Sequence, residues 1–193
     1  MSKLFYRYAA MSSGKSTQLL QVAHNYEERG MAVKLYTAAV DDRYGVGKVT
    51  SRLGVAREAL TFDEGTVFDA SVLGKGIACL LIDEAQFLSP QQAHALHRLA
   101  HEHKVPIMCY GLRSDFLGQA FAGSATLLVL ADDIEEIKTI CGCSRKASMN
   151  ARIDAAGRRV QSGDQILIGG NSRYVAMCPD CFYGAGVQAT TTV

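Results

Sequence analysis

The chain has 193 residues, a formal net charge of +1, 48% hydrophobic residues and 20% charged residues, typical of a globular protein with one sizeable core and room for a small appended module. A net charge near zero argues against a duplex nucleic-acid partner or an anionic membrane partner. No apolar run approaches the length of a membrane span and no secretion signal is recognisable, so we expect a cytoplasmic protein in a reducing compartment.

The first part of the chain predicts two strands and a helix. Residues 3–9 (KLFYRYA) and 31–38 (MAVKLYTA) read as buried strands. Residues 16–29 repeat apolar side chains at helical spacing and are followed by Gly30, a common residue at helix C-termini. The polar, glycine-bearing segment 41–54 is predicted to be a long loop, and such loops beside an α/β core are more often functional than merely connecting.

The next part continues the alternation of strands and helices. Residues 77–83 (IACLLID) predict a fully buried strand that ends in an acid, and 105–111 (VPIMCYG) predict another core strand. Ser89 and Pro90 have the residue types of an N-cap and first position for the helix between these strands. Residues 112–124 are predicted to be a second long loop. Apolar strands alternating with helices indicate an α/β fold with a mostly parallel sheet and helices on both faces.

The composition changes near residue 140, where cysteines, basic residues and glycines replace the apolar periodicity. We therefore expect an α/β domain over residues 1–140 and a small cysteine-bearing domain over 141–184. Residues 185–193 (AGVQATTTV) carry little that could build a core and are expected to be a disordered tail.

Residues 9–17 (AAMSSGKST) lie between the first predicted strand and the first predicted helix. A phosphate-binding loop needs main-chain N–H groups at a helix N-terminus, a lysine for the β- and γ-phosphates and a hydroxyl for magnesium, which Gly14, Lys15 and Ser16 offer. Gly-Lys-Ser alone is a weak signal, but its place between strand and helix strengthens it. Ala9 stands where the pattern has a glycine, and we expect a small residue to suffice there.

Asp83 and Glu84 lie at the C-terminal end of the strand predicted over 77–83, where open α/β sheets bind ligands. The aspartate can hold the water shell of magnesium. The glutamate can orient an attacking water, as in helicase-type and motor-type ATPases, or activate a substrate hydroxyl for phosphoryl transfer. The alternative without a site is an acidic pair that ends a strand at the surface. The pattern alone leaves these interpretations open.

Cys141-x-Cys143 is followed by 34 residues and then Cys178-x-x-Cys181, a pattern that predicts a tetrahedral four-thiolate zinc site. The first pair is one residue shorter than ordinary zinc spacing. A disulfide or free thiols are the alternatives, and a reducing compartment disfavours the disulfide. Four protein ligands would leave no open position on the metal, so the zinc would be structural.

The remaining cysteines and the histidines read as structural. Cys79 and Cys109 lie inside apolar runs, as small buried hydrophobic residues do. His97 and His101 have i, i+4 spacing on a predicted helix, but no glutamate or third ligand accompanies them in the sequence. We interpret this pair as part of a solvated helix face.

The ordered set AMSSGKST, YTAAVDDRYG, LLIDEAQF, YGLRSDF, KTICGCSRKASM and IGGNSRYVAMCPDC resembles the type II thymidine kinases, which are phosphate-loop deoxynucleoside kinases with a zinc-bearing lasso. The similarity runs from about residue 4 to residue 183. It implies a P-loop NTPase fold of the RecA-like type with a small zinc-ribbon or lasso domain. It also implies transfer of phosphate from ATP to the 5′-hydroxyl of thymidine in nucleoside salvage, a homotetramer, and feedback inhibition by thymidine triphosphate.

The resemblance also implies roles for residues of the ATP site. Glu84 matches the catalytic base for the 5′-hydroxyl, and Arg43 is a candidate for stabilising the transferring charge, with an exposed loop cation as its alternative. Asp83 and Ser16 would hold Mg-ATP directly or through water. The residues implied for ATP and magnesium are Ala9, Ala10, Met11, Ser12, Ser13, Gly14, Lys15, Ser16, Thr17, Asp41, Asp83 and Gln86.

For the nucleoside, the resemblance implies an aromatic contact from Phe116, packing by Tyr174, and recognition of the pyrimidine edge by the main chain of residues 165–169. Asn150 stands where some members have a small hydroxyl residue near the 5-methyl group of the base, which leaves the selectivity for thymine over uracil open. The residues implied for the nucleoside are Met11, Phe87, Leu112, Phe116, Phe121, Gln165, Ile166, Leu167, Ile168, Gly169 and Tyr174.

Two other classes of function are compatible with the motifs. One is a compact phosphate-loop ATPase whose zinc-ribbon module couples hydrolysis to nucleic acid. The other is a non-catalytic, zinc-stabilised nucleotide-binding module. A motor would usually need a second lobe or a basic track, and neither follows residue 140 in the sequence.

Overall fold

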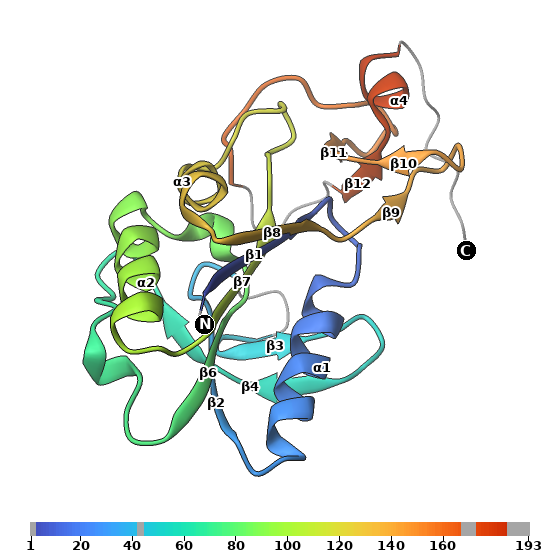
Figure 1. Ribbon diagram of the computed structural model, residues 1–193. Coiled ribbons are helices and arrows are strands. Elements are labelled where there is room, and N and C mark those ends of the chain that lie inside the picture. The colour runs from blue at the N-terminus through green and yellow to red at the C-terminus, as the bar shows by residue number, and fades with distance from the viewer. Residues whose placement is uncertain (1–2, 42–44, 167–172, 185–193) are drawn as a thin grey trace.

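The computed structural model describes residues 3–41, 45–166 and 173–184. At its centre is a six-stranded sheet with the order β5-β2-β6-β7-β1-β8, and every neighbouring pair in it is parallel (Figure 1). This confirms the predicted parallel α/β sheet. The strands are β1 (Leu4–Ala9), β2 (Ala32–Ala38), β5 (Leu60–Phe62), β6 (Ile77–Ile82), β7 (Ile107–Leu112) and β8 (Asp133–Glu136).

Helices cover both faces of the sheet. Helix α1 (Lys15–Glu27) lies on one face, and α2 (Pro90–Glu102) and α3 (Ala122–Leu130) lie on the other (Figure 1). Strand β6 shows why its sequence is apolar throughout. Cys79 and Leu81 belong to the core under α1, whereas Leu80 and Ile82 belong to the core under α2 and α3. Successive side chains of a strand point to opposite faces, so both sets must be hydrophobic.

Helix α2 begins where the sequence predicted. The Ser89 hydroxyl accepts a hydrogen bond from the Gln92 N–H at 3.1 Å, and the Gln92 side chain accepts one from the Ser89 N–H at 3.0 Å, which completes a capping box. Helix α1 ends at Glu27, two residues before the predicted end, and Gly30 follows with a φ of 70°. A short 3-10 turn, η1 (Ala70–Val72), precedes β6.

Two predicted loops contain regular structure. Within 41–54, strand β3 (Lys48–Thr50) pairs antiparallel with β4 (Ala56–Glu58), and Val49 packs in the core under α1. Helix α3 begins inside the predicted loop 112–124. Both predictions of a continuous loop were wrong. A three-residue strand carries almost no periodic signal, and the Phe121 N-cap of α3 makes no side-chain capping bond that a motif could reveal.

The C-terminal module, residues 141–166 and 173–184, has a small core of its own that includes Met149, Ile153 and Phe182. Figure 1 shows it beyond the β1–β8 side of the sheet. The predicted tail over 185–193 lies outside the described residues. Among those described, no helix is long and apolar enough to cross a membrane. The elements of the module are β10 (Lys146–Ala147), β11 (Met149–Ile153), β12 (Arg173–Met177) and α4 (Pro179–Tyr183). Strand β11 pairs with β12, and β10 pairs with β9 (Thr139–Ile140), which directly precedes the module.

Candidate active site

The phosphate-loop segment joins the end of β1 to the N-terminus of α1. Gly14 is the N-cap of α1 and has a φ of 84°. A Cβ at Gly14 would have nothing within 4 Å, so the left-handed backbone, and not a lack of space, favours glycine here. Ala9 differs, because it is the last residue of β1 and pairs with Leu112 of β7. The position where the pattern has its first glycine is therefore a strand position that any small residue can fill.

Lys15 and Ser16 have their side chains at the phosphate loop, where a nucleotide would bind. The Lys15 ammonium group donates to the Ala10 carbonyl at 3.2 Å and is largely buried. The Ser16 hydroxyl donates to Oδ2 of Asp83 at 3.0 Å. Burial, together with the neighbouring charge of Glu84, raises the pKa of Asp83 to about 7. A cation bound beside this carboxyl group would therefore lower the pKa of Asp83 and favour its ionised form.

Glu84 follows Asp83 in a left-handed conformation, with φ 52° and ψ 38°, at the start of the 3-10 turn η2 (Ala85–Phe87). A glutamate in this region is strained, and such strain is common where a side chain must point into a functional site. The Glu84 carboxylate accepts a hydrogen bond from the Gln86 amide, whose oxygen accepts one from the Leu112 N–H at 3.0 Å. Gln86 therefore connects Glu84 to the end of β7.

Two glycines that the sequence reading did not single out allow this turn to pack closely. A Cβ at Gly111 would lie 2.9 Å from the Gln86 side-chain oxygen. A Cβ at Gly123, in α3, would lie 2.5 Å from the Leu88 carbonyl oxygen. Both distances are too short for a side chain. A glycine at a strand end and another inside a helix are the sequence signals that indicate such close backbone approaches.

A cavity of about 890 Å³ unites the phosphate loop with the predicted nucleoside residues. This volume suits a small-molecule ligand. Ala9 and Ala10 are buried and do not line it, while Arg43, Leu167, Ile168 and Gly169 lie outside the described residues. The predicted residues that line the cavity are Met11, Ser12, Ser13, Gly14, Lys15, Ser16, Thr17, Asp41, Asp83, Glu84, Gln86, Phe87, Leu112, Phe116, Phe121, Gln165, Ile166 and Tyr174.

The cavity also has lining residues that the sequence did not predict. Asp115 is the clearest case, because its Oδ1 accepts from the N–H groups of Leu117 and Gln119, and its Oδ2 accepts from the Gln165 side chain at 2.9 Å. An aspartate that binds the N–H two residues on is a turn signal the sequence does contain. The other lining residues outside the predicted set are Gln18, Gln21, Thr37, Lys48, Thr50, Ser51, Arg52, Leu53, Ser114 and Asn150.

Arg152 connects the two aromatic residues predicted for the nucleoside. Its guanidinium carbon lies 3.7 Å from the centroid of the Phe116 ring, and its Nε donates to the Tyr174 hydroxyl at 3.0 Å. Arg152 is buried and also donates to the Asp164 carbonyl at 2.7 Å. Sequence reasoning missed this residue, since an isolated arginine on a short strand gives no signal of a stacking partner.

Two buried hydroxyl groups beside the cavity have no hydrogen-bond partner within the described part of the chain: those of Ser13 and Ser114. Buried polar atoms nearly always have a partner, so these two fit a site that receives a polar ligand. Ser13 belongs to the phosphate loop, where phosphate oxygens would supply the acceptor.

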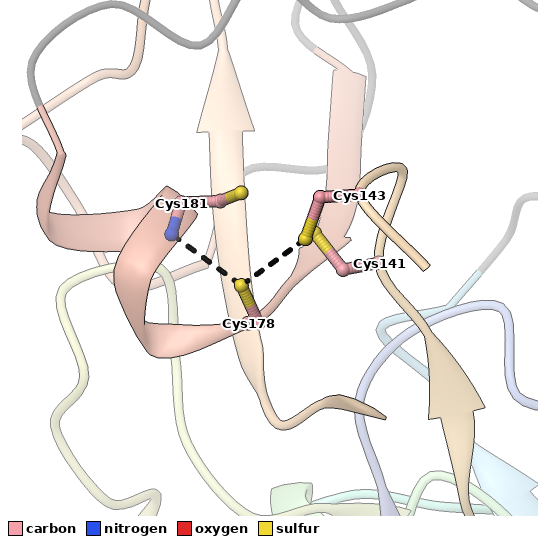
Figure 2. Close-up of side chains that lie close together, drawn as sticks. All are labelled: Cys141, Cys143, Cys178 and Cys181. Carbon is pink, nitrogen blue, oxygen red and sulfur yellow. Dashed lines mark hydrogen bonds between the residues drawn. The ribbon is translucent and has the colours of Figure 1, made fainter. Parts of the chain in front are cut away.

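The four clustered cysteines come together in the C-terminal module (Figure 2). Cys141 and Cys143 lie at the turn between β9 and β10, and Cys178 and Cys181 lie at the start of α4. All four sulfur atoms lie within 4.8 Å of one another, and the Cys143 and Cys178 sulfurs are 3.5 Å apart. Sulfurs bound to a tetrahedral zinc lie about 3.8 Å apart, whereas a disulfide would need about 2.05 Å. The cluster fits zinc and does not fit a disulfide.

The thiols of this cluster do not ionise alike. Burial acts to raise the pKa of Cys141, but main-chain hydrogen bonds from Cys143 and Cys178 and bonds with neighbouring thiols lower that pKa to about 7. Hydrogen bonds with the other three thiols raise the pKa of Cys181 to about 12. Neighbouring thiols therefore oppose full ionisation of the cluster, and a divalent cation is what would allow four thiolates.

The histidine pair has a third ligand-bearing neighbour after all. Ligand atoms of His97, His101 and Asp132 lie within 4.8 Å of one another, so the expectation of no third ligand was wrong. Asp132 is 31 residues from His101, which is why the sequence did not reveal it. Its Oδ2 lies 2.9 Å from His101 Nε2 and accepts from the Leu4 N–H at 2.8 Å. The carboxylate thus joins α2 to the start of β1, a structural role.

Comparison with known proteins shows the family of this chain. The family model for thymidine kinase matches residues 2–182. A thymidine kinase of Albidiferax ferrireducens is 64% identical over 190 residues, which cover 97% of this chain and 96% of that protein. A thymidine kinase of Chromobacterium violaceum is 61% identical over 183 residues, 95% of this chain and 99% of that protein. A phosphate loop, an acidic pair and a four-cysteine cluster thus occur in a chain that belongs to the thymidine kinase family.

Proposed function

We propose that this protein transfers the γ-phosphoryl group of ATP to the 5′-hydroxyl of thymidine, giving thymidine 5′-phosphate and ADP. The observation that carries this proposal is the shared cavity, which holds the phosphate loop, Glu84 and the aromatic residues Phe116 and Tyr174 together in a chain of the thymidine kinase family. A nucleoside and a triphosphate bound in the same cavity are the two partners that such a reaction needs.

On the ATP side, the main-chain N–H groups around Gly14 and the Lys15 ammonium group bind the β- and γ-phosphates. Ser16 and Asp83, already joined by a hydrogen bond, offer the hydroxyl and carboxylate oxygens that Mg²⁺ prefers. The magnesium ion, when bound with ATP, neutralises charge on the phosphate oxygens. The hydroxyl of Ser13, which has no hydrogen-bond partner among the described residues, supports the placement of phosphate in this loop.

On the nucleoside side, Glu84 takes the proton of the 5′-hydroxyl group. The oxygen of that hydroxyl forms a bond to the γ-phosphorus, and the bond between the γ-phosphorus and the β–γ bridging oxygen breaks. The electron pair of the broken bond leaves with ADP. The left-handed backbone of Glu84 and the hydrogen bond from Gln86 support this role, because they hold the carboxylate in the cavity. Family resemblance is the basis for the proposal that Arg43 stabilises charge on the transferring phosphoryl group.

Phe116 and Tyr174 pack against the nucleoside, and Asp115 orients the side chain of Gln165 at the cavity. In this proposal the main chain of residues 165–169 forms hydrogen bonds with the pyrimidine edge. For residues 167–169, this role rests on family resemblance alone. A structural zinc held by the four cysteines supports this module without an open coordination position. The homotetramer, inhibition by thymidine triphosphate and a cytoplasmic location are further proposals from resemblance.

An ADP-release assay tests the proposed function. Thymidine should stimulate ADP release from Mg-ATP strongly, and single-stranded DNA should not. If thymidine leaves turnover unchanged while single-stranded DNA raises it, the protein is an ATPase coupled to nucleic acid and the proposal is wrong. If neither ligand stimulates turnover but ATP binds, the protein is a nucleotide-binding module and the proposal is equally wrong.

A further inference from the structure

Four consecutive residues that follow β7 each contact the C-terminal module. Ser114, Asp115 and Phe116 line the cavity, and the module therefore holds residues 113–116, the nucleoside loop, at the cavity wall. The contacts are Arg113 Nη2 to the Ser148 carbonyl at 3.3 Å, Asn150 Nδ2 to the Ser114 carbonyl at 2.8 Å, Gln165 Nε2 to Asp115 Oδ2 at 2.9 Å, and the Arg152 guanidinium at 3.7 Å from the Phe116 ring centroid.

Among these contacts, Asn150 also reaches the phosphate loop. Its side-chain oxygen accepts a hydrogen bond from the Met11 N–H at 2.8 Å, while its NH₂ group donates to Ser114. The side chain is buried, with 2% of the residue exposed. Met11 belongs to the phosphate loop and Ser114 to the nucleoside loop, both residues line the cavity, and Asn150 is bonded to the main chain of both.

The orientation of the Asn150 amide follows from its partners. A reversed amide would set its NH₂ group against the Met11 N–H and its oxygen against the Ser114 carbonyl oxygen, and both contacts would be repulsive. With its oxygen bonded to Met11 and its NH₂ group to Ser114, the amide is committed to the main chain. This arrangement argues for a role in holding the two loops and against a role in reading the base.

We propose that Asn150 is a positioning residue that sets the phosphate loop relative to the nucleoside loop, so that the γ-phosphate and the 5′-hydroxyl meet in line. The proposal rests on the proposed function, since it concerns the geometry of that reaction. Strand β11 is the rigid part that carries Asn150, because all five of its residues are buried and paired with β12. Small displacements between reacting groups have large effects on turnover, so two hydrogen bonds at this junction matter.

Two substitutions separate the two hydrogen bonds. Asn150→Leu has nearly the same shape and can make neither bond. Asn150→Asp, assayed at pH 8 to favour the ionised carboxylate, keeps an oxygen for the Met11 N–H but places an oxygen against the Ser114 carbonyl. Arg113→Ala is the matched control, because Arg113 donates across the same junction to Ser148 and, within the described part of the chain, has no hydrogen bond to the phosphate loop.

We expect Asn150→Leu to lower kcat/KM for both ATP and thymidine by about tenfold or more. Asn150→Asp should restore the KM for ATP to within about threefold of the wild type while the KM for thymidine stays raised, since only the bond to Met11 is kept. Arg113→Ala should raise only the KM for thymidine. A direct readout is hydrogen exchange of the Met11 amide in protein labelled at its six methionines. Exchange should be faster in Asn150→Leu than in the wild type, Asn150→Asp and Arg113→Ala.

The proposal is overturned if Asn150→Leu leaves Met11 protected, or if it raises the KM for thymidine alone. If Asn150→Leu does not fold, Asn150→Asp decides, and a rise in the KM for ATP equal to that for thymidine would overturn the proposal. The exchange measurement needs no catalysis. A wild-type protein without thymidine-dependent turnover would therefore contradict the proposed function, while Met11 exchange in the variants would still test the junction.

Discussion

The hydroxyl of Ser16, in the first turn of α1, donates at 3.0 Å to Oδ2 of Asp83, the residue after β6, although the two residues lie 67 positions apart. Strand β7 lies between β1, which leads into the phosphate loop, and β6, which ends at Asp83. The bond therefore brings the segments that follow two non-adjacent strands, β1 and β6, together in one site. It brings together the hydroxyl and the carboxylate that would bind magnesium, next to Glu84.

Replacing Glu84 by glutamine tests the proposed base. We expect Glu84→Gln to keep ATP binding and to lose about 10²–10⁴-fold in kcat, because the amide cannot accept the proton of the 5′-hydroxyl. Single-turnover kinetics with saturating ATP and thymidine measures this loss. Turnover within about threefold of the wild type would show that another group takes the proton.

Asp83 should make the magnesium-free protein less stable as the pH rises. Its pKa in the folded protein, about 7, is above its ordinary value of 3.8, so the folded state binds the proton more tightly than the unfolded state. The stability from this group is fully present below about pH 4 and is lost as the pH rises through about 7. Relative to the wild type, Asp83→Asn should gain stability between pH 5 and 8, by at most a few kcal/mol.

Urea denaturation across that pH range, in buffer without magnesium and nucleotide, measures the difference between Asp83→Asn and the wild type. Titrating groups that do not interact with Asp83 are common to both proteins and cancel, so the measured difference belongs to Asp83 together with the neighbouring Glu84. Mg-ATP should reduce the difference, because it favours the ionised Asp83 of the wild type. Parallel stability curves for the two proteins from pH 5 to 8 would contradict the shifted pKa.

Arg152 should support nucleoside binding through Phe116. Arg152→Met removes the stacked guanidinium and the hydrogen bond to Tyr174, so we expect the KM for thymidine to rise about tenfold, with a smaller change in the KM for ATP. Arg152→Lys should not restore binding, since an ammonium group lacks the planar stack. Arg159→Met is a matched control, because Arg159 lies over Phe182, 4.2 Å from its centroid, and does not line the cavity. Equal effects of Arg152→Met and Arg159→Met would mean a loss of stability alone.

Zinc should be present at one equivalent per chain and should be needed for the order of the C-terminal module. Cys178→Ser should lose the metal, whereas Cys109→Ala should keep it, because Cys109 is buried in the core under α2 and α3. Metal analysis of protein purified without chelators measures the content, and less than about half an equivalent in the wild type would count against a four-thiolate site. Cys178→Ser should also weaken thymidine binding more than ATP binding.

Most of the sheet could be predicted because its strands are buried on both faces. Strand β6 was expected over 77–83 and lies over Ile77–Ile82, and Ser89 caps α2 as its sequence indicated. Such features are local, since a few adjacent residues carry the whole signal. Strand β3 and helix α3 lack that signal: the first is three residues long, and the second begins without a side-chain cap.

The motifs of the loops could be recognised in the sequence, but the contacts between the loops could not. Lys15, Ser16 and Glu84 belong to motifs whose residue types state their roles. Asn150 instead acts through Met11, 139 residues away, and through Ser114, 36 residues away. Arg152 likewise acts on Phe116, whose ring it stacks on. These relationships depend on how β11 packs against the sheet domain, and no short stretch of sequence encodes that packing.

The most direct test of the central claim is product analysis after incubation with Mg-ATP and thymidine. The proposed mechanism predicts one thymidine 5′-phosphate for each ADP, activity with 3′-deoxythymidine and none with 5′-deoxythymidine, because Glu84 accepts the proton of the 5′-hydroxyl. Mass spectrometry and phosphorus NMR identify the product and the position of its phosphate. ADP formed without a phosphorylated nucleoside, or phosphate found on the 3′-oxygen, would contradict the account.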